Sequence, residues 1–177
     1  TAAEIVNTWS HGELTRIFKV YGEEKFASRI ADFIIKEREK SPITNTLALS
    51  NLIKSAIPAA ARRTGGNPAK RTFQALRIAV NNELEVIESA IPQALNLLSV
   101  GGRLVILSFQ SLEDRIVKEI FSEYTKSKSP KELPIELPEF APKFKLIAKG
   151  ESASDKEIGD NSRAQSVRIR AIERVAA

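Results

Sequence analysis

One short apolar run constrains the fold more than any other part of this sequence. Residues 104–107 read Leu-Val-Ile-Leu, the pair Gly101-Gly102 precedes them, and a polar turn and a charged amphipathic segment follow. Apolar residues without alternation, bounded by turn signals, are typical of a strand covered on both faces. Such strands belong to parallel sheets, in which helices cover both sides and chemistry lies beyond the carboxyl ends. We therefore expect an α/β fold with a site at residues 108–115.

The turn at this strand end also has a purely structural interpretation. Ser111 is placed to cap the following helix, and Asp114 to interact with its positive end. A salt bridge to Arg115 is a further structural role for either local carboxylate. Both interpretations stay open, and the candidate catalytic residues are Ser108, Gln110, Ser111 and Asp114.

The first third of the chain predicts three short amphipathic helices. Gly22 is placed to end the first, Ser41-Pro42 to end the second, and Thr44 or Asn45 to cap the third. The apolar stripes at helical spacing are Leu14, Ile17, Phe18 and Tyr21, then Phe26, Ile30, Phe33 and Ile34, then Leu49, Leu52 and Ile53. The basic, turn-rich residues 62–68 then predict a boundary between a helical domain at 1–66 and a second domain at 67–177.

The second domain is expected to alternate helices and strands. A long helix is predicted over 69–98 with a kink or restart at Pro92, because proline removes a backbone donor. After the strand that contains 104–107 we expect a helix over 112–124, a proline-rich loop over 126–142, a strand over 144–149, a helical turn over 154–158 and a third strand over 165–174. The third strand is placed near an edge of the sheet.

The net charge of +5 at pH 7 is unevenly distributed. Between Lys40 and Asn82 there is no Asp or Glu, which a polyanion partner explains simply because neutralised phosphates release counterions. A solvated basic face explains it equally well. If the partner is RNA, the candidate binding residues are Arg62, Arg63, Lys70 and Arg71, then Gln74, Arg77 and Asn81 on one helix face, and Arg163 in the last strand region.

Composition excludes several classes of site. The chain has no cysteine and one histidine, His11, which rules out disulfides, thiolate metal sites and a multi-histidine site, so no metal site is expected. No apolar run approaches the ~20 residues that cross a bilayer, so no membrane partner is expected. These features fit a cytoplasmic protein.

Four blocks of sequence are similar to one enzyme family. They are Val6-Asn7-Thr8-Trp9, the block 71–84 that begins Arg-Thr-Phe-Gln-Ala-Leu-Arg, the block 108–118 that reads Ser-Phe-Gln-Ser-Leu-Glu-Asp-Arg-Ile-Val-Lys, and Asn161-Ser-Arg-Ala-Gln-Ser166 with Glu173-Arg174. The blocks resemble the bacterial S-adenosylmethionine-dependent methyltransferases that modify N4 of a cytosine in small-subunit ribosomal RNA. They follow the family's order and span nearly the whole chain.

The resemblance implies a C-terminal fragment. The fold expected from it is the C-terminal part of a Rossmann-like class I methyltransferase sheet plus an inserted all-α domain. The family's glycine-rich cofactor loop has no counterpart here, so we expect no S-adenosylmethionine-binding residues in this chain and no activity from it alone. The implied partner is small-subunit ribosomal RNA or the assembling small subunit. A homodimer, and a non-catalytic RNA-binding or structural module, stay open as alternatives.

Several positions depart from the family pattern. Gln110 and Asn67 stand where the family usually has histidine, and Lys70, Ser162 and Gln165 replace threonine, proline and arginine. Glutamine donates and accepts hydrogen bonds but does not titrate. If a histidine at 110 is needed chemically, this protein is slower or inactive; if it only positions the base, glutamine serves.

Overall fold

A computed structural model of the chain describes residues 1–63, 66–127, 129–130 and 140–177. The chain divides into two compact units, Thr1–Glu83 and Leu84–Ala177, each with its own hydrophobic core. The mixed α/β class predicted from the sequence is confirmed. Of the loop expected over 126–142, residues 128 and 131–139 lie outside the described part.

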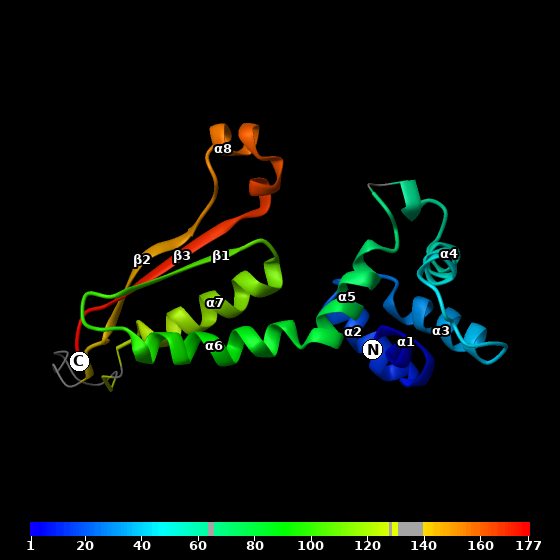
Figure 1. The fold of residues 1–177 in the computed structure, drawn as a ribbon, viewed down its shortest axis with the longest axis horizontal. Helices are drawn as coiled ribbons and strands as arrows, with labels where there is room; N and C mark the ends of the chain where they lie inside the picture. The colour runs from blue at the N-terminus through cyan, green and yellow to red at the C-terminus, as the bar shows by residue number, and fades with distance from the viewer. Residues whose placement is uncertain (64–65, 128, 131–139) are drawn as a thin grey trace. The chain divides into compact units, whose positions relative to one another are not determined.

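The N-terminal unit is helical (Figure 1). Its α-helices are α1 (Ala2–Thr8), α2 (His11–Val20), α3 (Ala27–Arg38), α4 (Thr46–Ala56) and α5 (Lys70–Asn81), with the short 3-10 helix η1 (Ala61–Arg63) after α4. The expected stripes form the core, since Ile17, Ile30 and Ile53 are fully buried. Asn45 caps α4 by accepting a hydrogen bond from the backbone nitrogen of Ala48 at 2.8 Å. All three predicted helices are therefore present.

Helix α5 packs with the N-terminal unit, against α1 and α2. Its Ala75 and Leu76 are buried in the same core as α2 and α3. This apolar face explains why the compact units divide at residues 83 and 84, whereas the domain boundary was predicted after residue 66. Asn82 adopts a left-handed conformation with φ of 51° and ends α5. The single long helix expected over 69–98 is therefore interrupted at Asn82.

The C-terminal unit is a three-stranded sheet with helices on one face. Helix α6 (Glu83–Leu97) continues through Pro92, so a restart of the helix there is wrong, and a kink stays a prediction. The remaining elements are β1 (Arg103–Ser108), α7 (Ser111–Tyr124), β2 (Phe144–Glu151), α8 (Asp155–Asp160), the 3-10 helix η3 (Ser162–Ser166) and β3 (Arg168–Arg174). Side chains of α6 and α7 share one core with Phe144 and Ile172 of the sheet.

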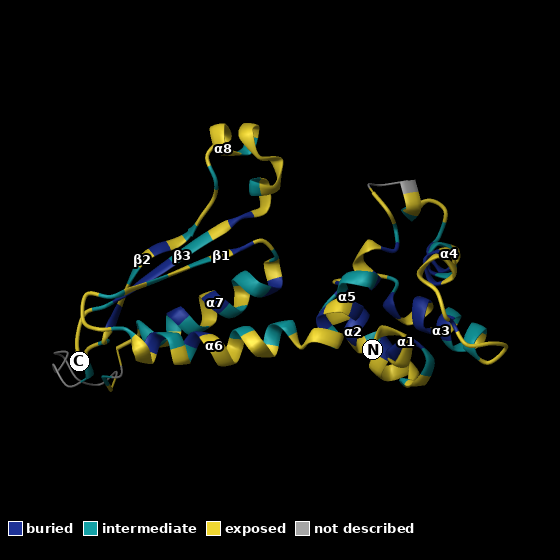
Figure 2. Cartoon of the chain, in the orientation of Figure 1, coloured by how far each residue is buried: buried dark blue, intermediate teal, exposed yellow. Residues whose placement is uncertain are grey.

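The sheet order is β1-β3-β2, and β3 is antiparallel to both neighbours. The expectation that β3 lies near an edge is wrong, because it is the central strand. The expectation of a parallel sheet covered on both faces is also wrong for these strands. Leu104 and Ile106 pack toward the core, whereas Val105 and Leu107 are 52% and 54% exposed. In Figure 2, β1 carries the colours of exposed and intermediate residues along most of its length. The Rossmann-like arrangement stays a prediction.

Gly22→Ala is expected to destabilise the N-terminal unit by about 1–3 kcal/mol, because a close-packed interior does not accept an added atom. A Cβ there would lie 2.7 Å from the carbonyl oxygens of Arg71 and Phe18. Trp9, the one tryptophan of the sequence, packs on this core, so its fluorescence during urea unfolding measures the effect. Gly12→Ala in α2 is the control: a Cβ there meets nothing within 4 Å, and we expect no loss of stability. Equal midpoints for the two variants would contradict the prediction.

Candidate functional site

The first candidate site is the turn from β1 into α7, where the sequence placed four catalytic candidates. Ser108 is buried at the end of β1, and Gln110 is the residue that precedes the first turn of α7. Ser111 is therefore the first helical residue and not the cap that its position suggested. The carboxylate of Glu113 accepts hydrogen bonds from the backbone nitrogens of Phe109 and Gln110, at 3.3 and 3.2 Å. This carboxylate is thus part of the helix start.

Asp114 forms a two-pronged ion pair with Arg170 of β3. Nε of Arg170 lies 2.7 Å from Oδ1 of Asp114, and a terminal guanidinium nitrogen lies 2.9 Å from Oδ2. Another guanidinium nitrogen donates to the carbonyl oxygen of Lys149 at 2.6 Å. The hydrogen bonds from Arg170 hold the pKa of Asp114 below its usual value. The ion-pair partner of Asp114 is therefore Arg170, whereas proximity in the sequence had suggested Arg115. This ion pair connects α7 to the central strand β3.

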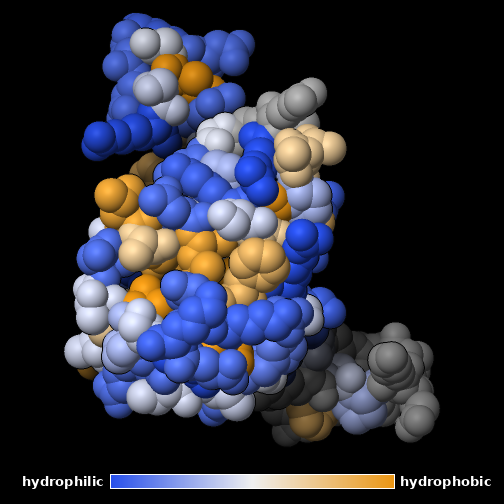
Figure 3. Space-filling view, turned by 90° about the vertical axis from the view of Figure 1, so that its right-hand side faces the viewer, coloured by the Kyte–Doolittle hydropathy of each residue, from blue (hydrophilic) through white to orange (hydrophobic). Residues whose placement is uncertain are grey.

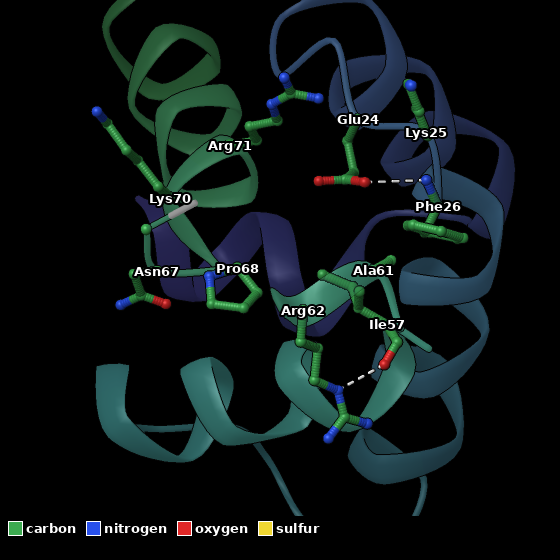
Figure 4. Close-up of a pocket in the computed structure, with 11 residues that line it drawn as sticks. Glu24, Lys25, Phe26, Ile57, Ala61, Arg62, Asn67, Pro68, Lys70 and Arg71 are labelled. Carbon is green, nitrogen blue, oxygen red and sulfur yellow. Dashed lines mark hydrogen bonds between the residues drawn. The ribbon is translucent and has the colours of Figure 1, made fainter. Parts of the chain in front are cut away.

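The second candidate site is a basic pocket inside the N-terminal unit, with a volume of about 680 Å³ (Figure 4). It brings together Arg62, Lys70 and Arg71, three of the predicted RNA-binding residues. Arg62 donates from Nε to the carbonyl oxygen of Ile57 at 2.7 Å, and Arg71 donates to the carbonyl oxygen of Glu23 at 3.1 Å. Both guanidinium groups are thereby oriented by the backbone. The side chain of Arg63 lies outside what the structure describes.

The polar side chains on one face of α5 form hydrogen bonds to other residues of the same unit. Gln74 donates to the carbonyl oxygen of Tyr21 at 3.1 Å, so it holds α5 against the end of α2. Arg77 and Asn81 both bind the carboxylate of Glu83, with nitrogen–oxygen distances of 2.9 to 3.1 Å. Arg163 belongs to η3 of the C-terminal unit and is exposed. An RNA-binding role for these four residues stays a prediction.

Two residues of the basic pocket were missed by the sequence analysis. Glu24 and Lys25 line it from the connection between α2 and α3, and Glu24 is buried. Neither carries a periodic signal, since they occupy a turn between two apolar stripes. Lys25 also lies before the acid-free interval from Lys40 to Asn82, from which most of the candidate RNA-binding residues were predicted. Only the fold brings this turn next to the start of α5.

Figure 3 shows one face of the N-terminal unit, on which apolar side chains gather in a band between hydrophilic regions. Within the described ranges, no helix combines the length and apolar character needed to cross a bilayer. The same residues contain no cluster of three His, Asp or Glu side chains that could hold a metal ion. Among the described residues, the candidate RNA-binding and catalytic residues come together at the basic pocket and at the β1–α7 turn.

Residues 1–175 match the model of the MraW methylase family. The chain belongs to this family. It is 58% identical over 174 residues to a ribosomal RNA small subunit methyltransferase H of Corynebacterium diphtheriae, covering 98% of this chain and 51% of the relative. A relative of the same name from Saccharopolyspora erythraea is 57% identical over 176 residues, covering 99% of this chain and 53% of the relative. The family resemblance inferred from the four sequence blocks is confirmed.

This MraW-family chain spans about half the length of the curated relatives that it matches. A nucleotide-type cofactor site normally has a glycine-rich turn that follows a strand and aims backbone amides at the ligand. Here Gly101-Gly102 precedes β1, and Gly65-Gly66 lies between η1 and α5. The described residues therefore do not fit S-adenosylmethionine, and its site is not assigned to any of them.

Proposed function

We propose that this chain is the substrate-side part of an enzyme that methylates N4 of a cytosine in small-subunit ribosomal RNA. The MraW family match over residues 1–175 carries this proposal. The donor we propose is S-adenosylmethionine, bound by the part of family proteins that this chain does not match. The proposed partner is the RNA alone or in the assembling small subunit, in the cytoplasm.

The roles proposed for this chain are to bind the RNA and to present the base. A base that is to be modified must leave its stack, which exposes the flanking phosphates and the base edges to the protein. The cations of the basic pocket are suited to phosphates. At the β1–α7 turn we assign Asp114 a positioning role, because its two oxygens accept hydrogen bonds from Arg170. Gln110, which directly precedes α7, is proposed to contact the base by hydrogen bonding, since it cannot titrate.

A chimera tests this function. The part of the Corynebacterium diphtheriae relative that matches this chain is replaced by this chain, and the purified chimera is incubated with labelled S-adenosylmethionine and unmodified small subunits. We expect label in the RNA, recovered after digestion as N4-methylcytidine. The unaltered relative is the control.

Two results of the chimera experiment would contradict the proposal. A folded chimera that binds S-adenosylmethionine but leaves the RNA unlabelled would favour the alternative of an RNA-binding module without catalysis. The missing glycine-rich turn is the observation that keeps this alternative in view. Label in a different nucleoside would refute the cytosine N4 position while leaving RNA methylation intact.

A further inference from the structure

The basic pocket of the N-terminal unit contains a largely buried carboxylate, one oxygen of which accepts a hydrogen bond from the backbone. Glu24 is 7% exposed, and its Oε1 accepts a hydrogen bond from the backbone nitrogen of Phe26 at 2.9 Å. Within the described part of the chain, no donor reaches the other oxygen, and Figure 4 shows this oxygen pointing into the pocket. An ionised carboxylate is an acceptor only, so an oxygen that faces a pocket accepts hydrogen bonds from a donor that enters it. The pocket therefore offers a strong acceptor to a ligand.

The rim of the same pocket is cationic. Lys25, Arg62, Lys70 and Arg71 surround the single carboxylate of Glu24. The lysine side chains are exposed, and no carboxylate of the described residues lies within ion-pair distance of them. The two guanidinium groups are oriented by the carbonyl oxygens of Ile57 and Glu23. A ligand that satisfies this rim carries negative charge.

The walls between carboxylate and cations are apolar. Phe26, Ile57 and Pro68 line the pocket, and Phe26 and Pro68 are half-buried, so each exposes part of its ring. The aromatic ring of Phe26 is a platform on which a base can stack. The volume of about 680 Å³ lies within the ordinary range of small-ligand sites.

We infer that this pocket binds one single-stranded RNA nucleotide whose base carries an exocyclic amino group. The inference rests on the proposed function and names a base-reading site within it. The amino group donates to the free oxygen of Glu24, as carboxylates do toward N4 of cytosine. The base stacks on the apolar wall, and the adjacent phosphates meet the lysines and arginines. Uracil presents a carbonyl oxygen in place of the amino group and therefore faces the carboxylate without a donor.

Binding of oligocytidylate and oligouridylate of equal length to the whole chain tests the inference by fluorescence anisotropy. We expect the wild type to prefer oligocytidylate by about tenfold, the discrimination of one good base-edge contact. In Glu24→Gln the amide oxygen keeps the hydrogen bond to Phe26 and the amide nitrogen turns toward the pocket. Because that nitrogen donates to the carbonyl oxygen of uracil, the preference is expected to disappear or reverse. Circular dichroism checks that the variant is folded.

A charge variant separates base reading from phosphate binding. Lys70→Gln is expected to weaken binding of both oligonucleotides equally and to lower the slope of log affinity against log salt by about 0.7, the value for one phosphate of a single strand. Lys36→Gln, on the exposed side of α3 and outside the pocket, is the matched control with no expected change. A base preference lost in Lys70→Gln would contradict the assignment of base reading to Glu24.

Three results would overturn the inference: equal affinity of the wild type for both oligonucleotides, an unchanged preference in folded Glu24→Gln, or no binding of either oligonucleotide. Failure here is distinguishable from failure of the proposed function. Methyl transfer by the chimera without a cytidylate preference refutes the pocket alone. A cytidylate preference without methyl transfer refutes the catalytic proposal alone.

Discussion

Phe121→Ala is expected to lower the free energy of unfolding of the C-terminal unit by about 3–5 kcal/mol, the usual cost of emptying a buried aromatic site. Phe121 lies on α7 and is 1% exposed. It belongs to the core in which α6 and α7 pack against Phe144 and Ile172 of the sheet. A loss of this size is a large share of the stability of an ordinary domain. Hydrogen exchange measured by mass spectrometry should show faster exchange in β1, β3 and α7.

Two observations check that the effect of Phe121→Ala is local. Phe109→Ala in the same unit is the matched control, because Phe109 is half exposed and its removal should change stability by no more than about 0.5 kcal/mol. The N-terminal core shares no residue with the core around Phe121. Exchange in α2 and α3, and the fluorescence of Trp9, should therefore stay as in the wild type. Equal effects of Phe121→Ala and Phe109→Ala would contradict the assigned core.

Asp114→Asn is expected to destabilise the C-terminal unit by about 1–3 kcal/mol at neutral pH. The change removes the charge that holds Arg170 and leaves the guanidinium of a largely buried arginine without its ion partner. Urea unfolding followed by circular dichroism measures the loss. Glu119→Gln on an exposed position of α7 is the control, with an expected change within about 0.5 kcal/mol.

The cost of Asp114→Asn should depend on pH in a defined direction. The folded pKa of Asp114 lies below the ordinary value of 3.8, so the folded state binds a proton less readily than the unfolded state. The ion pair therefore contributes its full stability above the unfolded pKa, and this contribution is lost as the pH falls through the folded pKa. The difference between wild type and variant should shrink as the pH drops below about 4. A difference that stays constant down to that range would show that the ion pair is not its source.

The N-terminal helices were predictable because their signals are local. An apolar residue every three or four positions defines the buried stripe of a helix. Asn45 caps α4 through its own side chain, within one turn of the helix that it starts. Arg62, Lys70 and Arg71, which the sequence singled out from the acid-free interval, line one pocket, and their role in RNA binding stays a prediction.

The errors concern relations between distant segments. The run at 104–107 lacks polar residues, yet only alternate residues pack on α6 and α7, so the apolar pattern could not reveal the half-exposed face. The position of β3 between β1 and β2 depends on its pairing with Arg103–Ser108, which lies far away in the sequence, and no local pattern encodes this pairing. The ion pair of Asp114 with Arg170 joins residues 56 positions apart and follows from that pairing. Glu24 escaped notice because its burial depends on a helix that begins at Lys70.

The central strand of the sheet, β3, is the last of the three strands in the sequence, and this order matters while the chain is being made. In the part of the chain that the structure describes, β1 and β2 both pair with Arg168–Arg174, which follows them in the sequence. Because synthesis runs from the N-terminus to the C-terminus, β1 and β2 are made before β3 and wait unpaired until β3 follows them. Unpaired strand edges are prone to aggregate during such a delay. A stop codon before Arg168 would thus remove the strand that pairs with both β1 and β2.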